Sequence, residues 1–301
     1  MLKGLHPEDE RFLANLSRIN ERAVRAQRQV SSGKRIETVS DNPDEVSNLL
    51  AARADLARIR QVNSNLGRIK TEVDMAEESV ANSIKIVERA RVLAAQGFNG
   101  TQTAETRAGI AAEVRNLMQQ LVNQSNAFVN GRYLFAGNAD GTQPFTFSEG
   151  PPLSAGAYQG SAATRAALNA TGNAFPIALS GAEIFASPNP SQNAFAAISD
   201  LYAALTTNDE AAIGIQVARL ATASEHLNQK LAFYGAAQNN VRDAVAAAAN
   251  LEVRLQGQIS QTEDADLSEA IVAMNRAAFE QQATLQSRGR LPQKSLFDYL
   301  G

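Results

Sequence analysis

Apolar residues recur along much of this chain at alternating steps of four and three. Near the N-terminus they fall at Phe12, Leu16, Ile19, Ala23, Ala26 and Val30. The same spacing resumes after Pro43, returns between Leu220 and Ile259, and appears once more from Leu267 to Leu285. Such spacing is typical of the narrow seam of a coiled coil. It predicts long helices whose apolar stripe needs a partner helix.

The middle of the chain follows a different pattern. A further helix is predicted from an N-cap at Thr103 to a stop at Asn130-Gly131. Beyond it Gly, Pro, Thr, Ser and Asn become frequent, and apolar residues alternate, as at Phe145 and Phe147. The segment "NATGN" at 169–173 lies between two short alternating runs and predicts a hairpin turn. We therefore expect a small β-rich insert.

The order of these patterns predicts a mainly α fold, a long coiled-coil helical rod with a small β-rich insert domain. Five segments are expected: an N-terminal assembly helix and turn (1–42), the first half of the rod (43–137), the β-rich insert (138–190), the second half of the rod (191–262) and a C-terminal assembly helix (263–301). Rods with narrow seams usually complete them with other chains. The predicted assembly interface pairs the two chain ends through Phe12, Leu16, Ile19, Ala23 and Val30 on one side and Leu267, Ile271, Met274, Ala278 and Leu285 on the other.

The turn between the first two predicted helices contains Gly33-Lys34-Arg35, which resembles the end of a phosphate-binding loop. Arg28 stands where that motif needs its first Gly, Arg35 follows the Lys in place of Ser or Thr, and a helix precedes it rather than a strand. A helix stop explains the residues better, with Gly33 at positive φ. Asn42 is then expected as N-cap of the next helix, with Pro43 at its first position.

Composition removes several classes of function. The chain has 301 residues, a net charge of -3, no Cys, and only two His, His6 and His226. Cys-based zinc sites and thiol nucleophiles are therefore excluded, and no catalytic, cofactor-binding or metal site is predicted. We see no apolar run long enough to span a membrane and no Sec-type signal peptide. No nucleic acid, membrane or small-molecule substrate is expected as a partner.

Arg11, Arg18 and Arg25 recur one heptad apart and form a basic stripe beside the first seam. Two interpretations remain open. The stripe is a solvated helix face, or it guides an acidic helix towards this seam. The second interpretation has a candidate in "TEDADLSE", which carries Glu263, Asp264, Asp266 and Glu269.

Three separated motifs carry a resemblance to a known family. Residues 29–61, "QVSSGKRIETVSDNPDEVSNLLAARADLARIRQ", resemble the N-terminal signature of the flagellin superfamily. "NGRYLFAGNADGTQPF" at 130–145 is similar to a segment of the hook-associated protein 3 family, found between flagellar hook and filament. Residues 259–286 and the closing "SLFDYL" resemble the superfamily's C-terminal helix. The start, "MLKGLHPEDE", departs from the usual pattern.

The resemblance implies a structural, non-catalytic protein of the bacterial flagellum with a helical rod of flagellin type. It also implies secretion through the flagellar type III apparatus to the hook–filament junction, with chain ends that order on assembly. The implied partners are hook-associated protein 1, flagellin, copies of the chain itself and an export chaperone. The resemblance leaves filament flagellin as an alternative. From the residues, the alternatives are an enzyme using a phosphorylated ligand at Gly33-Lys34-Arg35 and an amphipathic membrane-surface protein.

Overall fold

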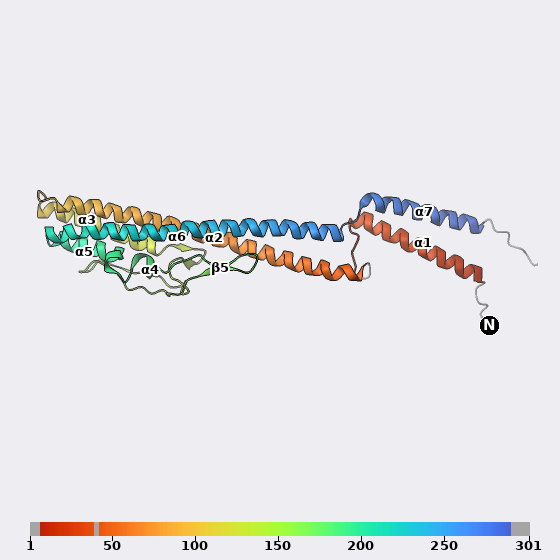
Figure 1. Cartoon of the computed structure of the whole chain (residues 1–301), viewed down its shortest axis with the longest axis horizontal. Helices are drawn as coiled ribbons and strands as arrows, with labels where there is room; N and C mark the ends of the chain where they lie inside the picture. The colour runs from red at the N-terminus through yellow and green to blue at the C-terminus, as the bar shows by residue number, and fades with distance from the viewer. Residues whose placement is uncertain (1–6, 39–41, 290–301) are drawn as a thin grey trace, which may run out of the picture. The chain divides into compact units, whose positions relative to one another are not determined.

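The computed structural model describes residues 7–38 and 42–289. Residues 1–6 of the unusual N-terminal start, which include His6, and the "SLFDYL" motif lie outside the described residues. The long helices are α1 (Pro7–Ser32), α2 (Pro43–Phe98), α3 (Ala104–Ser125), α5 (Ala194–Thr206), α6 (Glu210–Glu263) and α7 (Leu267–Gly289) (Figure 1). A short α4 (Gly181–Phe185) and a 3-10 turn (Pro190–Gln192) precede α5. The mainly α fold with a small β-containing segment is confirmed.

The helices divide into two compact units. The terminal unit contains Met1–Arg58 and Glu252–Gly301, and the central unit contains Ile59–Leu251. Helices α2 and α6 contribute to both, because their 56 and 54 residues extend through both ranges. The division into assembly helices, two rod halves and an insert at residues 138–190 stays a prediction.

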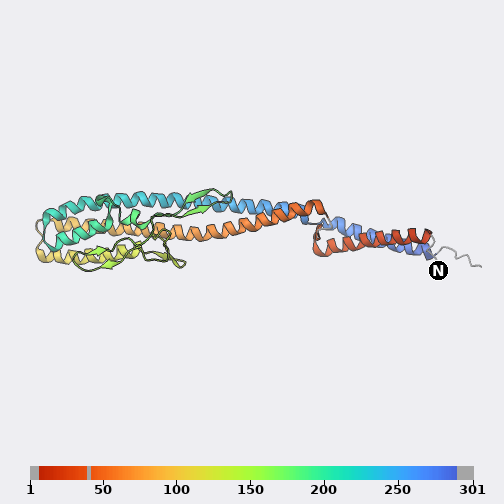
Figure 2. The ribbon, with the colours of Figure 1, turned by 90° about the horizontal axis from the view of Figure 1, so that it is seen from below.

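In the terminal unit, α1 and α7 lie side by side and run antiparallel (Figure 2). Asp9 near the start of α1 forms an ion pair with Arg288 near the end of α7, and Arg22 lies 2.8 Å from Glu280. Helices α1 and α7 therefore contact each other within the chain, and the assembly interface expected at the two chain ends stays a prediction.

The central unit packs α3 against α5 and encloses an aromatic core. Phe135, Phe145, Phe185 and Tyr234 are fully buried. The rings of Phe135 and Phe185 are 5.3 Å apart at an interplanar angle of 82°, an edge-to-face arrangement that suits their quadrupoles. The aromatic residues that are scarce in the helical seams are thus concentrated where the insert meets the helices.

The β segment consists of three antiparallel pairs of very short strands. They are β1 (Phe128–Val129) with β2 (Arg132–Tyr133), β3 (Phe147–Ser148) with β4 (Ser154–Ala155), and β5 (Ala166–Leu168) with β6 (Ala174–Pro176). The hairpin turn predicted at 169–173 is confirmed, since Gly172 has a φ of 87° and the Asn169 N–H donates to the Asn173 carbonyl at 3.0 Å.

The predicted end of the third helix is wrong. Helix α3 stops at Ser125, five residues before the Asn130-Gly131 stop signal. Asn130 and Gly131 instead form the turn of the β1–β2 hairpin, with φ values of 51° and 84°. Two consecutive residues at positive φ suit the tight turn of a hairpin. The helix ends early because the Asn126 side chain bonds the backbone of Phe145, accepting from its N–H at 2.9 Å and donating to its carbonyl at 2.8 Å.

Candidate functional site

The turn after α1 acts as a helix stop, as its sequence predicted. Gly33 has a φ of 72°, and its N–H donates to the Gln29 carbonyl at 2.9 Å. Helix α2 begins at Pro43, and the Asn42 carbonyl accepts the first helical hydrogen bond from the Val46 N–H at 3.1 Å. The Lys34 ammonium lies 2.6 Å from a carboxylate oxygen of Glu263. A lysine that is already bound to a protein carboxylate does not support a phosphate site.

Glu263, the last residue of α6, joins this turn to the chain before α7. Its carboxylate bonds Lys34 with one oxygen and Arg53 with the other, at 2.6 and 2.5 Å. Its carbonyl accepts the N–H groups of Arg35 and Ile36, at 2.6 and 3.3 Å, and the Ala265 N–H donates to the Gly33 carbonyl at 2.9 Å. We call residues 33–36, 263–265 and Arg53 the clasp.

The charge of Glu263 is stabilised by its partners in spite of its burial. The residue is only 5% exposed. Burial by itself raises the pKa of this carboxyl, but the hydrogen bonds and positive charges of Lys34 and Arg53 outweigh that effect and hold the pKa below its usual value. Glu263 is therefore anionic at neutral pH, with both oxygens engaged. Sequence reasoning had grouped it with an acidic run and missed this role.

Arg35 adds a second link across the clasp. Its guanidinium donates to Glu45 in the first turn of α2 at 2.6 Å and to the Thr262 carbonyl near the end of α6 at 2.7 Å. The carbonyl lies at the end of a helix, where backbone acceptors lack helical partners. The basic residues after Gly33 therefore bind the C-terminal part of the chain rather than a ligand.

The predicted seam residues of α1 face α7. Ile19 is buried, whereas Phe12, Leu16, Ala23 and Val30 are half-buried. On α7 the expected register is wrong. Met274 is half-buried, but Ala278 is exposed, and Leu267, Ile271 and Leu285 are 49, 44 and 50% exposed. Their role in contacts with other chains stays a prediction.

Helix α7 meets α1 through positions that share only Met274 with the predicted seam. Ala270 and Ala277 are buried, and Met274, Gln281 and Thr284 are half-buried. Their steps of four and three match those of the predicted seam, displaced along the helix. With 3.6 residues per turn, the predicted positions Leu267, Ile271, Ala278 and Leu285 all fall on one flank of this contact face.

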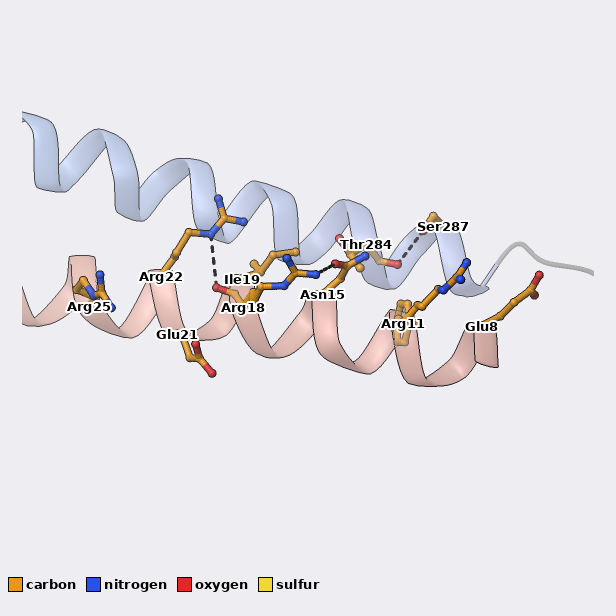
Figure 3. Close-up of a pocket in the computed structure, with 11 residues that line it drawn as sticks. Glu8, Arg11, Asn15, Arg18, Ile19, Glu21, Arg22, Arg25, Thr284 and Ser287 are labelled. Carbon is orange, nitrogen blue, oxygen red and sulfur yellow. Dashed lines mark hydrogen bonds between the residues drawn. The ribbon is translucent and has the colours of Figure 1, made fainter. Parts of the chain in front are cut away.

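The opposite flank of the helix pair is polar. A groove of about 880 Å³ runs there, and Figure 3 shows Arg11, Arg18, Arg22 and Arg25 of α1 along it with Thr284 and Ser287 of α7. The groove shows that the arginine-bearing flank of α1 and the Thr284 flank of α7 lie on one face of the helix pair. The remaining flanks of the two helices therefore lie together on the opposite face. Leu16 and Ala23 therefore lie on the same side of the pair as Leu267, Ile271, Ala278 and Leu285. We call these six residues the apolar face.

The acidic segment before α7 does not meet the basic stripe in this chain. Glu263 bonds Lys34 and Arg53, and Asp264 accepts a hydrogen bond from Ser260. Asp266 caps α7, accepting from the N–H groups of Ser268 and Glu269 at 2.8 and 3.1 Å. Within residues 7–38 and 42–289 the expected guiding contact is therefore absent, because the acidic residues serve the clasp and the start of α7.

Other candidate chemistry is structural. His226 is buried, and its Nε2 lies 2.9 Å from the Glu183 carbonyl. Within residues 7–38 and 42–289, no cluster of three His, Cys, Asp or Glu side chains is placed to hold a metal ion. None of the helices described there is long and apolar enough to cross a membrane.

Parts of the sequence are similar to known proteins. Residues 10–140 match the family described as the bacterial flagellin N-terminal helical region. A stretch of 127 residues is 30% identical to flagellar hook-associated protein 3 of Escherichia coli K12, covering 40% of this chain and 39% of that protein. Another of 140 residues is 32% identical to flagellin D of Rhizobium meliloti, covering 45% and 33%. The chain thus spans less than half the length of these relatives.

Solved structures share the fold over a larger part of the chain. A flagellar hook-associated protein of Vibrio parahaemolyticus superimposes with a TM-score of 0.65 at 20% identity, covering 74% of this chain and 100% of that one. The FlgL protein of Xanthomonas campestris gives a TM-score of 0.59 at 21% identity, covering 69% and 99%. At 20 and 21% identity these structures show that the chain shares their fold.

Proposed function

We propose that this chain, whose residues 10–140 carry the N-terminal helical region of bacterial flagellin, is a structural component of the bacterial flagellum. Its role is to join hook to filament, as a protein of the hook-associated protein 3 type. The sequence match to hook-associated protein 3 and the shared fold with solved hook-associated proteins support this role. The role is non-catalytic and needs no cofactor.

The apolar face carries the proposal. Leu267, Ile271 and Leu285 each leave about half of their surface open to solvent, although they follow the heptad spacing of a buried seam. Water-exposed Leu and Ile at such spacing are stabilised when another helix covers them. A chain whose two ends pair with each other and still present such a face is suited to assembly with further helices.

The second candidate is filament flagellin, which the flagellin D match favours. Two motifs weigh against it. This chain has Asn42-Pro43-Asp44 where the resemblance to flagellins implies Asp-Ala-Ala, and it has the run Tyr133 to Gly137 that resembles the hook-associated family. Leu134, Phe135 and Ala136 of this run are buried, so the motif belongs to the core of the central unit.

The partners we propose are hook-associated protein 1 on the hook side, flagellin on the filament side, copies of the chain itself, and an export chaperone. Export through the flagellar type III apparatus to the hook–filament junction is part of the same proposal. A chain that joins two tubular structures must present surfaces to both of them, and heterologous contacts between copies build open helical structures rather than closed dimers.

Gene deletion separates the two candidates. Loss of a junction protein leaves hooks intact and releases flagellin into the medium, whereas loss of a sole flagellin leaves none to release. Electron microscopy of the cells and immunoblotting of the medium give the answer. Cells that keep complete filaments after deletion contradict the proposed role.

A double variant then tests the interface. Leu16→Asp with Ile271→Asp places two charges on the apolar face, and each charge resists burial against another helix. We expect export with no incorporation at the hook tip, while the central unit keeps its circular dichroism and unfolding transition. Filaments of normal number and length from this variant would refute assembly through the terminal helices.

A further inference from the structure

The clasp joins the segments that flank α1 and α7 through several hydrogen bonds and ion pairs. Glu263 alone makes four contacts across it, with the side chains of Lys34 and Arg53 and with the N–H groups of Arg35 and Ile36. The 33–36 turn leads directly out of α1, and residues 264–266 lead directly into α7. Both helices therefore leave from segments that the same residue holds.

The contact between α1 and α7 fully buries few apolar side chains. Its fully buried residues, within the part of the chain that the structure describes, are Ile19, Ala26, Ala270 and Ala277. Three of these are alanines, which remove little apolar surface from water. Ordering two helices of 26 and 23 residues has a large conformational entropy cost, so this seam needs support from elsewhere.

The bonds of Glu263 have the properties of such a support. Charged hydrogen bonds are stronger than neutral ones, and they strengthen further when water is excluded from one partner. The Glu263 side chain is 6% exposed, whereas Lys34 and Arg53 are each 45% exposed. The two cations keep contact with solvent while the carboxylate lies between the segments it joins.

We propose that Glu263 is the positioning residue that couples the ordering of α1 to the ordering of α7. When its contacts form, both turns are fixed and both helices start from defined positions. When they are lost, the 33–36 turn and the 264–266 turn separate, and the small seam cannot keep the helices together. The coupling itself does not depend on the proposed function. Only its consequence rests on that function: the apolar face, which both helices build, forms as one unit for assembly.

Hydrogen exchange of the intact chain in rising trimethylamine N-oxide tests the coupling. This osmolyte favours burial and so promotes ordering of marginally stable segments. In the unmodified protein we expect peptides from α1 and from α7 to become protected at the same osmolyte concentration. Glu263→Gln should move both midpoints to higher osmolyte together, and Glu263→Asp, which keeps the charge, should move them less.

Glu225→Gln is the control, since Glu225 is an exposed carboxylate of α6 that lies in the central unit. We expect its midpoints, and the protection of the central unit in every variant, to equal those of the unmodified protein. Separate midpoints for α1 and α7 in the unmodified chain overturn the proposal. The proposal is also overturned if Glu263→Gln shifts the midpoint of α7 alone or shifts neither midpoint. It is overturned as well if α1 and α7 show no protection at any osmolyte concentration.

The outcome is separable from that of the proposed function. A chain whose ends order together but that never enters the hook–filament structure keeps the coupling and refutes the flagellar role. A chain that is incorporated normally while α1 and α7 order independently keeps the role and refutes the coupling.

Discussion

Replacing the three large exposed residues of the apolar face by serine should prevent assembly without unfolding the chain. Leu267, Ile271 and Leu285 are 49, 44 and 50% exposed, so about half of each side chain is available to a further helix. Burying a whole Leu or Ile side chain contributes about 1.5–3 kcal/mol. The triple variant therefore loses about 2–4 kcal/mol of assembly free energy, which is about 30- to 1000-fold in affinity.

Competition inside the cell measures this ratio. The unmodified chain and the triple variant are expressed together, and mass spectrometry of purified hooks gives their proportion against that in the secreted fraction. We expect the variant to be depleted at least about 30-fold. Leu168→Ser, at a 60% exposed position of β5 in the central unit, is the control and should compete equally. Equal incorporation of the triple variant, with equal secretion and an unfolding free energy within about 0.5 kcal/mol of the original, would refute the reasoning.

Three further changes address the clasp and the core. The pKa of Glu263 is lowered in the folded state, so its contribution to stability is present above the ordinary carboxyl value of 4.5 and is lost as pH falls through the lower folded value. The protection of terminal-unit amides, measured relative to their intrinsic exchange rate at each pH, should therefore fall below pH 4.5, and it should fall less after Glu263→Gln. Arg107→Met removes a buried guanidinium that bonds Gly97, Asn208 and Glu210. Urea denaturation should show that the unfolding free energy of the central unit falls by about 2–4 kcal/mol. An unchanged urea midpoint would contradict these contacts. Gly137→Ala should destabilise the protein by about 1–3 kcal/mol more than Gly131→Ala. Both glycines have positive φ, but only at 137 would the new Cβ lie 2.1 Å from a backbone oxygen. Equal thermal midpoints would argue against the clash.

Helix boundaries with a local cause were predictable from the sequence. Gly33 ends α1 because it adopts positive φ at little cost, and Pro43 opens α2 because its missing N–H would be unpaired there anyway. The Thr103 side chain accepts from the Thr106 N–H at 3.2 Å, as an N-cap should. Each of these signals involves residues within about four positions of one another, so the sequence holds the whole interaction.

The end of α3 shows where local reasoning fails. The Asn130-Gly131 pair suits a helix stop and a hairpin turn equally well, because both need positive φ. The helix ends before this pair, at the position where the Asn126 side chain bonds the backbone of Phe145, nineteen residues further along the chain. Neither the spacing nor the composition of the segment contains that contact.

The heptad spacing of both chain ends was enough to predict that α1 and α7 are long helices with apolar stripes that pair. It was not enough to choose the stripe, because positions displaced by a few residues on α7 repeat at the same steps of four and three. In the folded chain the small residues Ala270 and Ala277 are buried at the contact with α1, whereas about half of each of Leu267, Ile271 and Leu285 stays exposed. Glu263 likewise became the centre of the clasp only when folding brought Lys34 and Arg53, more than two hundred residues away, to its carboxylate. Helix formation depends on neighbours in the chain, whereas the choice of a contact face and of an ion-pair partner depends on which distant surfaces fit together.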